Sequence, residues 1–148
     1  MKIINKDITT VTKGFIVHQT NCFTMGSGLA KSLYLKYPII KEAHSKFVKS
    51  MPAIDCLGKV GFIMAAEELC ICNLYGQYNY GYDGGRYTDY HALKTGLETI
   101  NDHTPPFCLI YIPYGIGAGL GGGDWNVIYQ IIESVFSKSS KEIFICKI

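Results

Sequence analysis

Two glycine-rich segments hold most of the residues whose types and spacing could do chemistry. Residues 21–30 read NCFTMGSGLA and residues 115–124 read GIGAGLGGGD, and each follows an apolar run and precedes a helical pattern. Open α/β sheets bind ligands at strand ends, where glycines let backbone N–H groups surround an anion and a helix N-terminus adds partial positive charge. One such turn could merely end a strand, but the pair predicts a diphosphate site.

His18, Asn21 and Asp124 are the candidate catalytic residues beside these segments. His18 lies near the end of the apolar run FIVHQ, three residues before Asn21. A neutral imidazole can act as a general base, and an unshifted one titrates near pH ~6.5. A histidine that ends a buried strand can equally be structural. Asp124 precedes WNVIYQII, so it either caps a helix or takes part in catalysis.

Alternating strands and helices must position these residues. Apolar runs predict strands at residues 1–8, 14–21, 59–65, 69–75, 106–114 and 142–148. Helical spacing predicts helices at residues 28–38, 39–51, 88–100 and 124–136, with Thr88 as N-cap of the third. Their mixed order predicts an α/β fold, a single domain over residues 1–148 with helices on both faces of one sheet.

The composition is that of an ordinary globular chain. Hydrophobic residues make up 48% and charged residues 18%, and no apolar run approaches the ~20 residues of a membrane span. The N-terminus lacks the apolar core of a signal peptide, so we expect a cytoplasmic protein with no membrane partner. A net charge of +2 with scattered lysines disfavours nucleic acid as a partner, except as a modified substrate.

The cysteines and the other histidines predict no metal site. Cys70 and Cys72 share one face of an apolar run without a second close pair, so we expect reduced core residues. His44, His91 and His103 have no acidic or cysteine partner in register, and we expect them on the surface.

Three segments together resemble a known family. KDIT near the start, VHQTNCFTMGSGLAKSLYLKYP and IPYGIGAGLGGGDW, in this order, look like the macro domain, an ADP-ribose-binding fold. The resemblance covers essentially the whole chain and implies a three-layer α/β/α fold with a mixed six-stranded sheet. Within the superfamily the chain resembles the branch that contains ADP-ribose 1''-phosphate phosphatases and terminal ADP-ribose glycohydrolases.

The resemblance also implies a set of ligand contacts. Asp7 corresponds to the residue that accepts from the adenine amino group, although an aspartate there could also simply cap a turn. Asn21 corresponds to the residue at the distal ribose. The implied ligand-binding residues are Asp7, Ile8, Asn21, Met25, Gly26, Ser27, Gly28, Leu29, Ala30, Tyr114, Gly115, Ile116, Gly117, Ala118, Gly119 and Leu120.

The chain departs from part of that branch. Glycohydrolases that form a covalent lysyl intermediate carry a lysine after the strand that reads ICNL here, whereas residues 75–86 contain none and Gln77 or a neighbour takes its place. The second-loop aspartate of those enzymes falls on Gly121 or Gly122. Lysine-based removal of ADP-ribose is therefore disfavoured, while His18 resembles the position that phosphatase members use.

These observations favour a phosphatase, without cofactor and monomeric, that converts ADP-ribose 1''-phosphate to ADP-ribose. Two alternatives stay open: a hydrolase that releases ADP-ribose from a modified protein or nucleic acid by substrate-assisted attack of water, and a non-catalytic ADP-ribose reader. The tyrosine-rich residues 75–87 could form a flap over the distal ribose or pack a long loop onto the surface.

Overall fold

One mixed sheet organises the molecule, and the computed structural model describes all of residues 1–148. The strands are β1 (Lys2–Asn5), β2 (Gly14–Gln19), β3 (Val60–Ala66), β4 (Leu69–Leu74), β5 (Leu109–Pro113) and β6 (Glu142–Lys147). Their order is β1-β6-β5-β2-β4-β3. Every neighbouring pair is parallel except β3 with β4, so the prediction of a mixed six-stranded sheet is confirmed.

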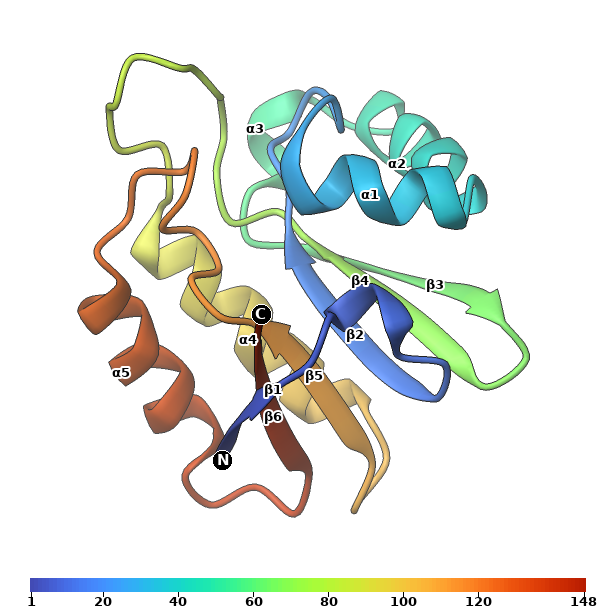
Figure 1. Ribbon diagram of the computed structural model, residues 1–148. Helices are drawn as coiled ribbons and strands as arrows, with labels where there is room; N and C mark the ends of the chain where they lie inside the picture. The colour runs from blue at the N-terminus through green and yellow to red at the C-terminus, as the bar shows by residue number, and fades with distance from the viewer.

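Helices cover both faces of this sheet (Figure 1). One face carries α1 (Gly28–Lys36), α2 (Ile39–Lys49), the short α3 (Ala53–Cys56) and the 3-10 turn η1 (Ile8–Thr10), and the other carries α4 (Tyr90–His103) and α5 (Trp125–Phe136). The four long helices were predicted. The two short elements were not, because three or four residues are too few to show a helical period. None of the helices has the length and apolar character that crossing a bilayer requires.

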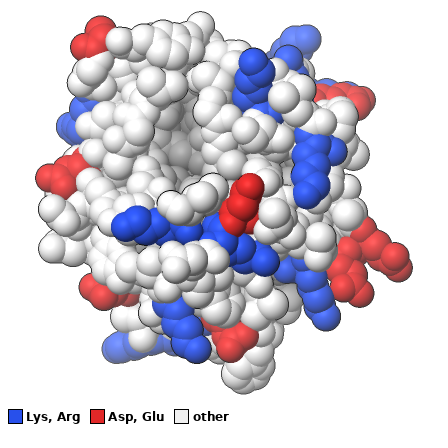
Figure 2. All heavy atoms as spheres, viewed as in Figure 1, with Lys and Arg blue, Asp and Glu red and all other residues white.

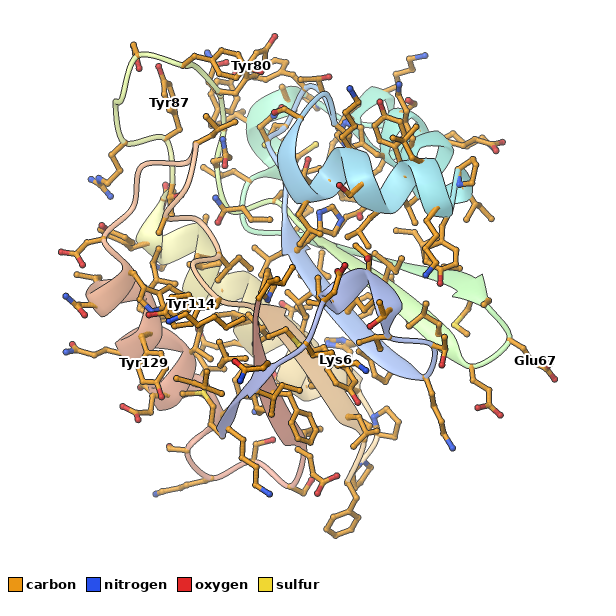
Figure 3. All side chains as sticks on the ribbon, viewed as in Figure 1. Lys6, Glu67, Tyr80, Tyr87, Tyr114 and Tyr129 are labelled. Atoms are coloured by element: carbon orange, nitrogen blue, oxygen red, sulfur yellow. The ribbon has the colours of Figure 1, made fainter.

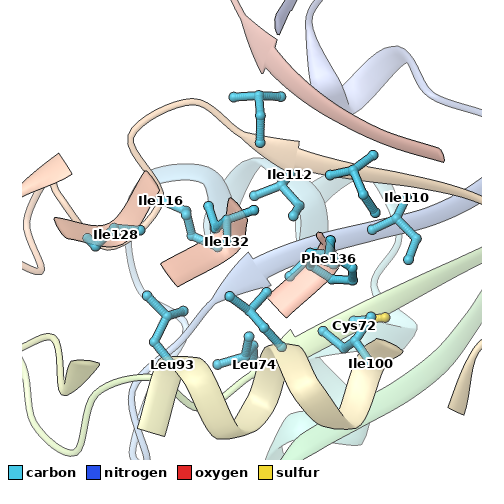
Figure 4. Close-up of a cluster of buried hydrophobic side chains, with 14 of the residues drawn as sticks. Cys72, Leu74, Leu93, Ile100, Ile110, Ile112, Ile116, Ile128, Ile132 and Phe136 are labelled. Carbon is cyan, nitrogen blue, oxygen red and sulfur yellow. The ribbon is translucent and has the colours of Figure 1, made fainter. Parts of the chain in front are cut away.

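Two apolar cores separate the three layers. The larger lies between the sheet and α4 and α5, where Leu93 and Ile100 meet Cys72 and Leu74 of β4 (Figure 4). All six residues of β4 are buried, because helices cover both faces of the sheet at this strand. Cys70 and Cys72 point into this core from one face of β4, as predicted. The second core lies under α1 and α2.

Two details of the prediction were wrong. Asp89 caps α4, because its carboxylate accepts a 3.0 Å hydrogen bond from the N–H of Ala92, whereas Thr88 lies one residue outside the helix. His44 is buried, not on the surface, because it follows Ile40 by one helical turn on the face of α2 that packs on the sheet. His91 and His103 are exposed as predicted.

Candidate functional site

A cleft of about 300 Å³ opens at the carboxyl ends of β2, β4 and β5. Its walls are the first loop, residues 20–27, with the start of α1; the second loop, residues 114–124; and residues 80–82 of the tyrosine-rich segment. Figure 2 shows a hollow walled by uncharged side chains. The two glycine-rich segments therefore face each other across one cavity, as their positions after strands predicted.

A second pocket adjoins this cleft and shares Leu29, Pro113 and Tyr114 with it. Asp7 and Ile8, the implied adenine contacts, line this second pocket. Figure 3 shows Tyr114 and Lys6 on this side of the molecule, well away from Tyr80 at the far end of the cleft. The two hollows together form an elongated site with Tyr114 at the junction.

Most of the implied ligand residues line these two hollows. The cleft is lined by Asn21, Met25, Gly26, Ser27, Gly28, Leu29, Ala30, Tyr114, Gly115, Ile116, Gly117, Gly119 and Leu120, together with His18. Ala118 does not line it, because its side chain packs against the core under α5. Asp124 lines neither hollow.

Backbone N–H groups, and no charged side chains, are the anion-binding groups of the cleft. No Lys, Arg, Asp or Glu lines it. In the second loop the N–H groups of Gly117, Gly119 and Leu120 form no hydrogen bond within the protein, and at the start of α1 neither do those of Gly28 and Leu29. The N-cap Ser27 adds no side-chain bond to this helix end. Such groups attract an anion such as a diphosphate from both sides.

The glycines of the second loop divide into two kinds. A Cβ at Gly121 or Gly123 would lie 2.8 Å from the carbonyl oxygen of Gly117, which no side chain tolerates. Gly117 itself has a φ of +74°, a conformation that favours glycine. A Cβ at Gly119, in contrast, meets no atom within 4 Å, and this residue lines the cleft. Close packing therefore explains several of the glycines, and Gly119 keeps space free for a ligand.

Three side-chain hydrogen bonds tie the second loop to the base of the tyrosine-rich segment. The hydroxyl of Thr88 donates to the carbonyl of Gly117 at 2.7 Å, and the amide of Gln19 donates to Thr88 Oγ1 at 2.9 Å and to Gln77 Oε1 at 2.8 Å. The N–H of Thr88 also donates to Gly121 O at 2.9 Å. The sequence offered no signal for Gln19 and Thr88, because each acts through partners distant in the chain.

The tyrosine-rich segment contributes one side of the cleft. Tyr80, Gly81 and Tyr82 line it, and Tyr80 lies at its outer end (Figure 3). Gln77 also lines the cleft. The segment is held locally by Asp83, which accepts a 2.8 Å hydrogen bond from the hydroxyl of Tyr87.

His18 lies on the floor of the cleft and is 1% exposed. Its Nε2 is 2.6 Å from Oδ1 of Asn73 on β4, and its Nδ1 has no partner within the protein. Burial lowers the pKa of His18 from 6.5 to about 4, although the Asn73 hydrogen bond opposes the shift. The condition for a titration near pH 6.5, an unshifted environment, is therefore not met, and the imidazole is neutral at neutral pH.

The other candidate side chains all stabilise local turns. Asn21 Oδ1 accepts from the N–H groups of Phe23 and Thr24, both at 2.8 Å, which leaves its Nδ2 as a donor. Asp124 Oδ1 accepts from the N–H of Asn126 at 2.8 Å, so Asp124 caps α5 outside the cleft. Of the two roles open to it, the geometry supports the cap.

Asp7 has the capping role that the sequence left open, and it also lines the second pocket. Its Oδ1 caps η1 by accepting from the N–H and hydroxyl of Thr9 at 2.9 and 2.7 Å. The hydroxyl bond and then the N–H bond hold the pKa of Asp7 below its usual value, so the side chain is a carboxylate at neutral pH. Oδ2 accepts no hydrogen bond within the protein, and the residue lines the second pocket.

Comparisons with known proteins agree with this fold. No protein-family model matches the sequence. A 17.5 kDa protein from the tk-vs intergenic region of Enterobacteria phage T4 is 33% identical over 131 residues, which cover 83% of this chain and 80% of the phage protein. The solved structure of the macrodomain of DarG from Mycobacterium tuberculosis matches 99% of this chain and 97% of its own, with a TM-score of 0.78 at 19% identity. The chain belongs to the family of the phage protein and has the macro-domain fold.

Two further solved structures match this chain. A protein of Bacteroides thetaiotaomicron is 25% identical, with a TM-score of 0.83 over 99% of this chain and 97% of its own. DarTG of Thermosipho africanus, solved in complex with ADP-ribose, has a TM-score of 0.74 at 13% identity and matches 97% of this chain but 40% of its own. The macro-domain fold is therefore shared by chains that have diverged far in sequence.

We expect His18 to make the stability of the protein depend on pH. The unfolded chain takes up a proton at this residue below about pH 6.5, whereas the folded chain does so only below about pH 4. The free energy of unfolding should therefore fall as the pH drops through this window, by roughly 3 kcal/mol from His18 alone. Urea titrations of the wild type and His18→Gln at pH 7 and pH 4 measure this difference.

Both proteins keep His44, whose pKa burial also lowers. His44 therefore contributes the same pH dependence to both proteins, and the difference between them belongs to His18. An identical loss of stability in the wild type and His18→Gln would contradict the burial of a neutral His18.

Proposed function

We propose that this macro domain binds ADP-ribose, with the diphosphate held between the first and second loops. The observation that carries the proposal is the set of unpaired backbone N–H groups on both walls of a cleft that contains no charged side chain. An uncharged cleft cannot hold a diphosphate by ion pairs, so these backbone groups must do it. The similarity in fold to a chain solved with ADP-ribose supports the same ligand class.

The second pocket fits the adenosine half of this ligand. It joins the cleft at Tyr114, and it offers the unoccupied carboxylate oxygen of Asp7, an acceptor that an adenine amino group can reach. The distal ribose then lies at the other end, beside Asn21, His18 and the tyrosine-rich segment. We propose a monomer in the cytoplasm that needs no cofactor.

We further propose that the protein removes the phosphate of ADP-ribose 1''-phosphate. His18 is favoured for this step because it lines the cleft, as Asn21 does. The imidazole takes a proton from a water as that water attacks phosphorus, the bond between phosphorus and the 1''-oxygen breaks, and the leaving oxygen takes up the same proton. The backbone N–H groups stabilise the charge that develops on the phosphoryl oxygens.

The alternative activities differ in what they need from the cleft. Removal of ADP-ribose through a lysyl intermediate needs a lysine, and the cleft contains none. In substrate-assisted hydrolysis the ligand itself activates the water, and a reader protein catalyses nothing. Both functions therefore need only the groups of the cleft that bind ADP-ribose. Assays with ADP-ribose 1''-phosphate, ADP-ribosylated protein and ADP-ribosylated nucleic acid distinguish the three functions.

Gly119→Glu should abolish ADP-ribose binding without unfolding the protein. A Cβ at this position meets no atom, so the side chain enters the cleft, where its bulk and charge exclude a diphosphate. Calorimetry with millimolar ADP-ribose measures the loss. Val127→Glu is the matched control, because it adds the same charge at an exposed position of α5 and should bind as the wild type does. Retained affinity in Gly119→Glu would mean that the diphosphate does not lie at the second loop.

Asp7→Asn should weaken ADP-ribose but leave ribose 5-phosphate unchanged. Asparagine caps a helix as well as aspartate does, so η1 should persist. The substitution converts the free oxygen into an NH₂ group, which cannot accept from the adenine amino group. Affinities for both ligands test this, and equal losses would remove Asp7 from the adenine site.

His18→Ala should lower the turnover of ADP-ribose 1''-phosphate by at least ~10²-fold, while the affinity for ADP-ribose stays nearly unchanged. Because the pKa of His18 is about 4, its protonation should not change the wild-type rate between pH 5.5 and 8. Steady-state kinetics across this pH range test both statements. A folded His18→Ala protein with full phosphatase activity would favour the reader or the substrate-assisted hydrolase.

A further inference from the structure

Thr88 joins the tyrosine-rich segment to the second loop from a buried position. It lies between that segment and α4, is 2% exposed and does not line the cleft. Its hydroxyl donates to the carbonyl oxygen of Gly117 at 2.7 Å. Its N–H donates to the carbonyl of Gly121 at 2.9 Å, as does the N–H of Tyr87 at 2.8 Å. Thr88 therefore holds the second loop at both Gly117 and Gly121, and the two segments lie side by side (Figure 1).

The hydrogen atoms of this contact can all be assigned. The side-chain amide nitrogen of Gln77 donates to the carbonyl of Asn79 at 2.9 Å, so the amide oxygen of Gln77 is left for Gln19. Gln19 must then present its NH₂ group to that oxygen, and it presents the same group to Thr88 Oγ1. A hydroxyl has one hydrogen, which Thr88 gives to Gly117, so its oxygen is free to accept from Gln19. The bonds therefore run in one direction and end on a carbonyl of the second loop.

The second loop approaches the Thr88 hydroxyl closely because it has glycines there. A Cβ at Gly121 would lie 2.5 Å from Thr88 Oγ1, and one at Gly117 would lie 3.1 Å from it. Between these glycines lie Gly119 and Leu120, which line the cleft and whose N–H groups have no partner within the protein. The two contacts with Thr88 therefore lie on either side of residues whose N–H groups are free to bind an anion.

We propose that Thr88 is a positioning residue for the diphosphate, because its hydroxyl holds the second loop in its anion-binding shape before the ligand arrives. A loop that is already ordered loses less conformational freedom on binding, so the ligand binds more tightly. Asp89 caps α4, so the hydroxyl of Thr88 is not used at that helix end. The effect of Thr88 on affinity rests on the ADP-ribose binding proposed above, whereas its effect on the loop of the free protein does not.

A buried hydroxyl can also serve stability alone, and Thr104 at the other end of α4 is such a case. Thr104 is 6% exposed, and its hydroxyl donates to the carbonyl of Ile100 at 2.7 Å. It lines neither hollow. The two threonines thus share residue type, burial and the length of a bond to a backbone carbonyl. Thr104→Val is therefore the matched control for Thr88→Val, because each substitution removes such a bond and nearly keeps the shape of the side chain.

Calorimetry with ADP-ribose measures the effect on affinity. Thr88→Val should bind ADP-ribose at least ~5-fold more weakly than the wild type, because the hydrogen bond that orders the loop is lost. Thr88→Ser keeps the hydroxyl and should restore the wild-type affinity, and Thr104→Val should bind as the wild type does. Thermal unfolding checks that each variant is folded at the temperature of the titration.

NMR of the ligand-free protein tests the loop itself. ¹⁵N relaxation of the wild type should give order parameters near ~0.85 at Gly117, Gly119 and Gly121, the value of rigid backbone. Thr88→Val should lower these order parameters, whereas Thr88→Ser and Thr104→Val should leave them unchanged. This measurement needs no ligand and distinguishes a loop that has lost its order from a protein that is merely less stable.

Three results would overturn the positioning role. The first is wild-type affinity in Thr88→Val, the second is an equal loss of affinity in Thr104→Val, and the third is a second loop that stays rigid in Thr88→Val. If Thr88→Val does not fold, Thr88→Ser and Thr88→Ala decide, because they differ by the hydroxyl oxygen alone. Equal affinities of that pair would then overturn the proposal.

This inference and the proposed function fail separately. A wild type that does not bind ADP-ribose would refute the proposed function, and the order parameters of the free protein would still decide whether Thr88 orders the second loop. A wild type that binds ADP-ribose no better than Thr88→Val does would refute the positioning role alone.

Discussion

The binding cleft depends on how the second loop satisfies its carbonyl groups. The carbonyl of Gly117 accepts from the hydroxyl of Thr88 and from the N–H of Gly123, and that of Gly121 accepts from the N–H of Thr88. These bonds occupy the two carbonyl oxygens, whereas the N–H groups of Gly117, Gly119 and Leu120 form no hydrogen bond within the protein. The loop therefore keeps free donors, which attract an anion.

The absence of charged side chains from the cleft has a consequence for selectivity. Ion pairs attract any anion of suitable charge, whereas backbone N–H groups at two fixed walls select for the spacing and shape of the phosphates. Two kinds of glycine allow the second loop to form such a wall. Several glycines pack closely against Thr88 and Gln19, which fixes the loop, whereas the absence of a side chain at Gly119 leaves room for a ligand. The one titratable group on the floor of the cleft is a histidine that burial keeps neutral.

The chemistry proposed for the distal end follows from that neutrality. An imidazole with a pKa of about 4 is a weak base, but it stays neutral at every ordinary pH. Its Nε2 lies 2.6 Å from Oδ1 of Asn73 in the neighbouring strand. This amide partner adds no charge to the floor of the cleft beside an anionic ligand.

The sequence by itself determined the layers and the place of the site. Apolar runs located the six strands, helical spacing located the four long helices, and glycines after two strands indicated facing loops, because these patterns are local along the chain. The caps at Asp7 and Asp124 were also visible, since a capping residue acts on its near neighbours.

Only the tertiary structure decided how side chains from distant segments act on one another. Asn73 meets His18 through strand pairing 55 residues apart, and Thr88 reaches Gly117 across 29 residues. The burial of His44, the neutral state of His18 and the adjoining pocket at Asp7 likewise depend on what packs nearby. A pKa and the direction of an N–H group are set by three-dimensional surroundings, which residue types and spacing do not contain.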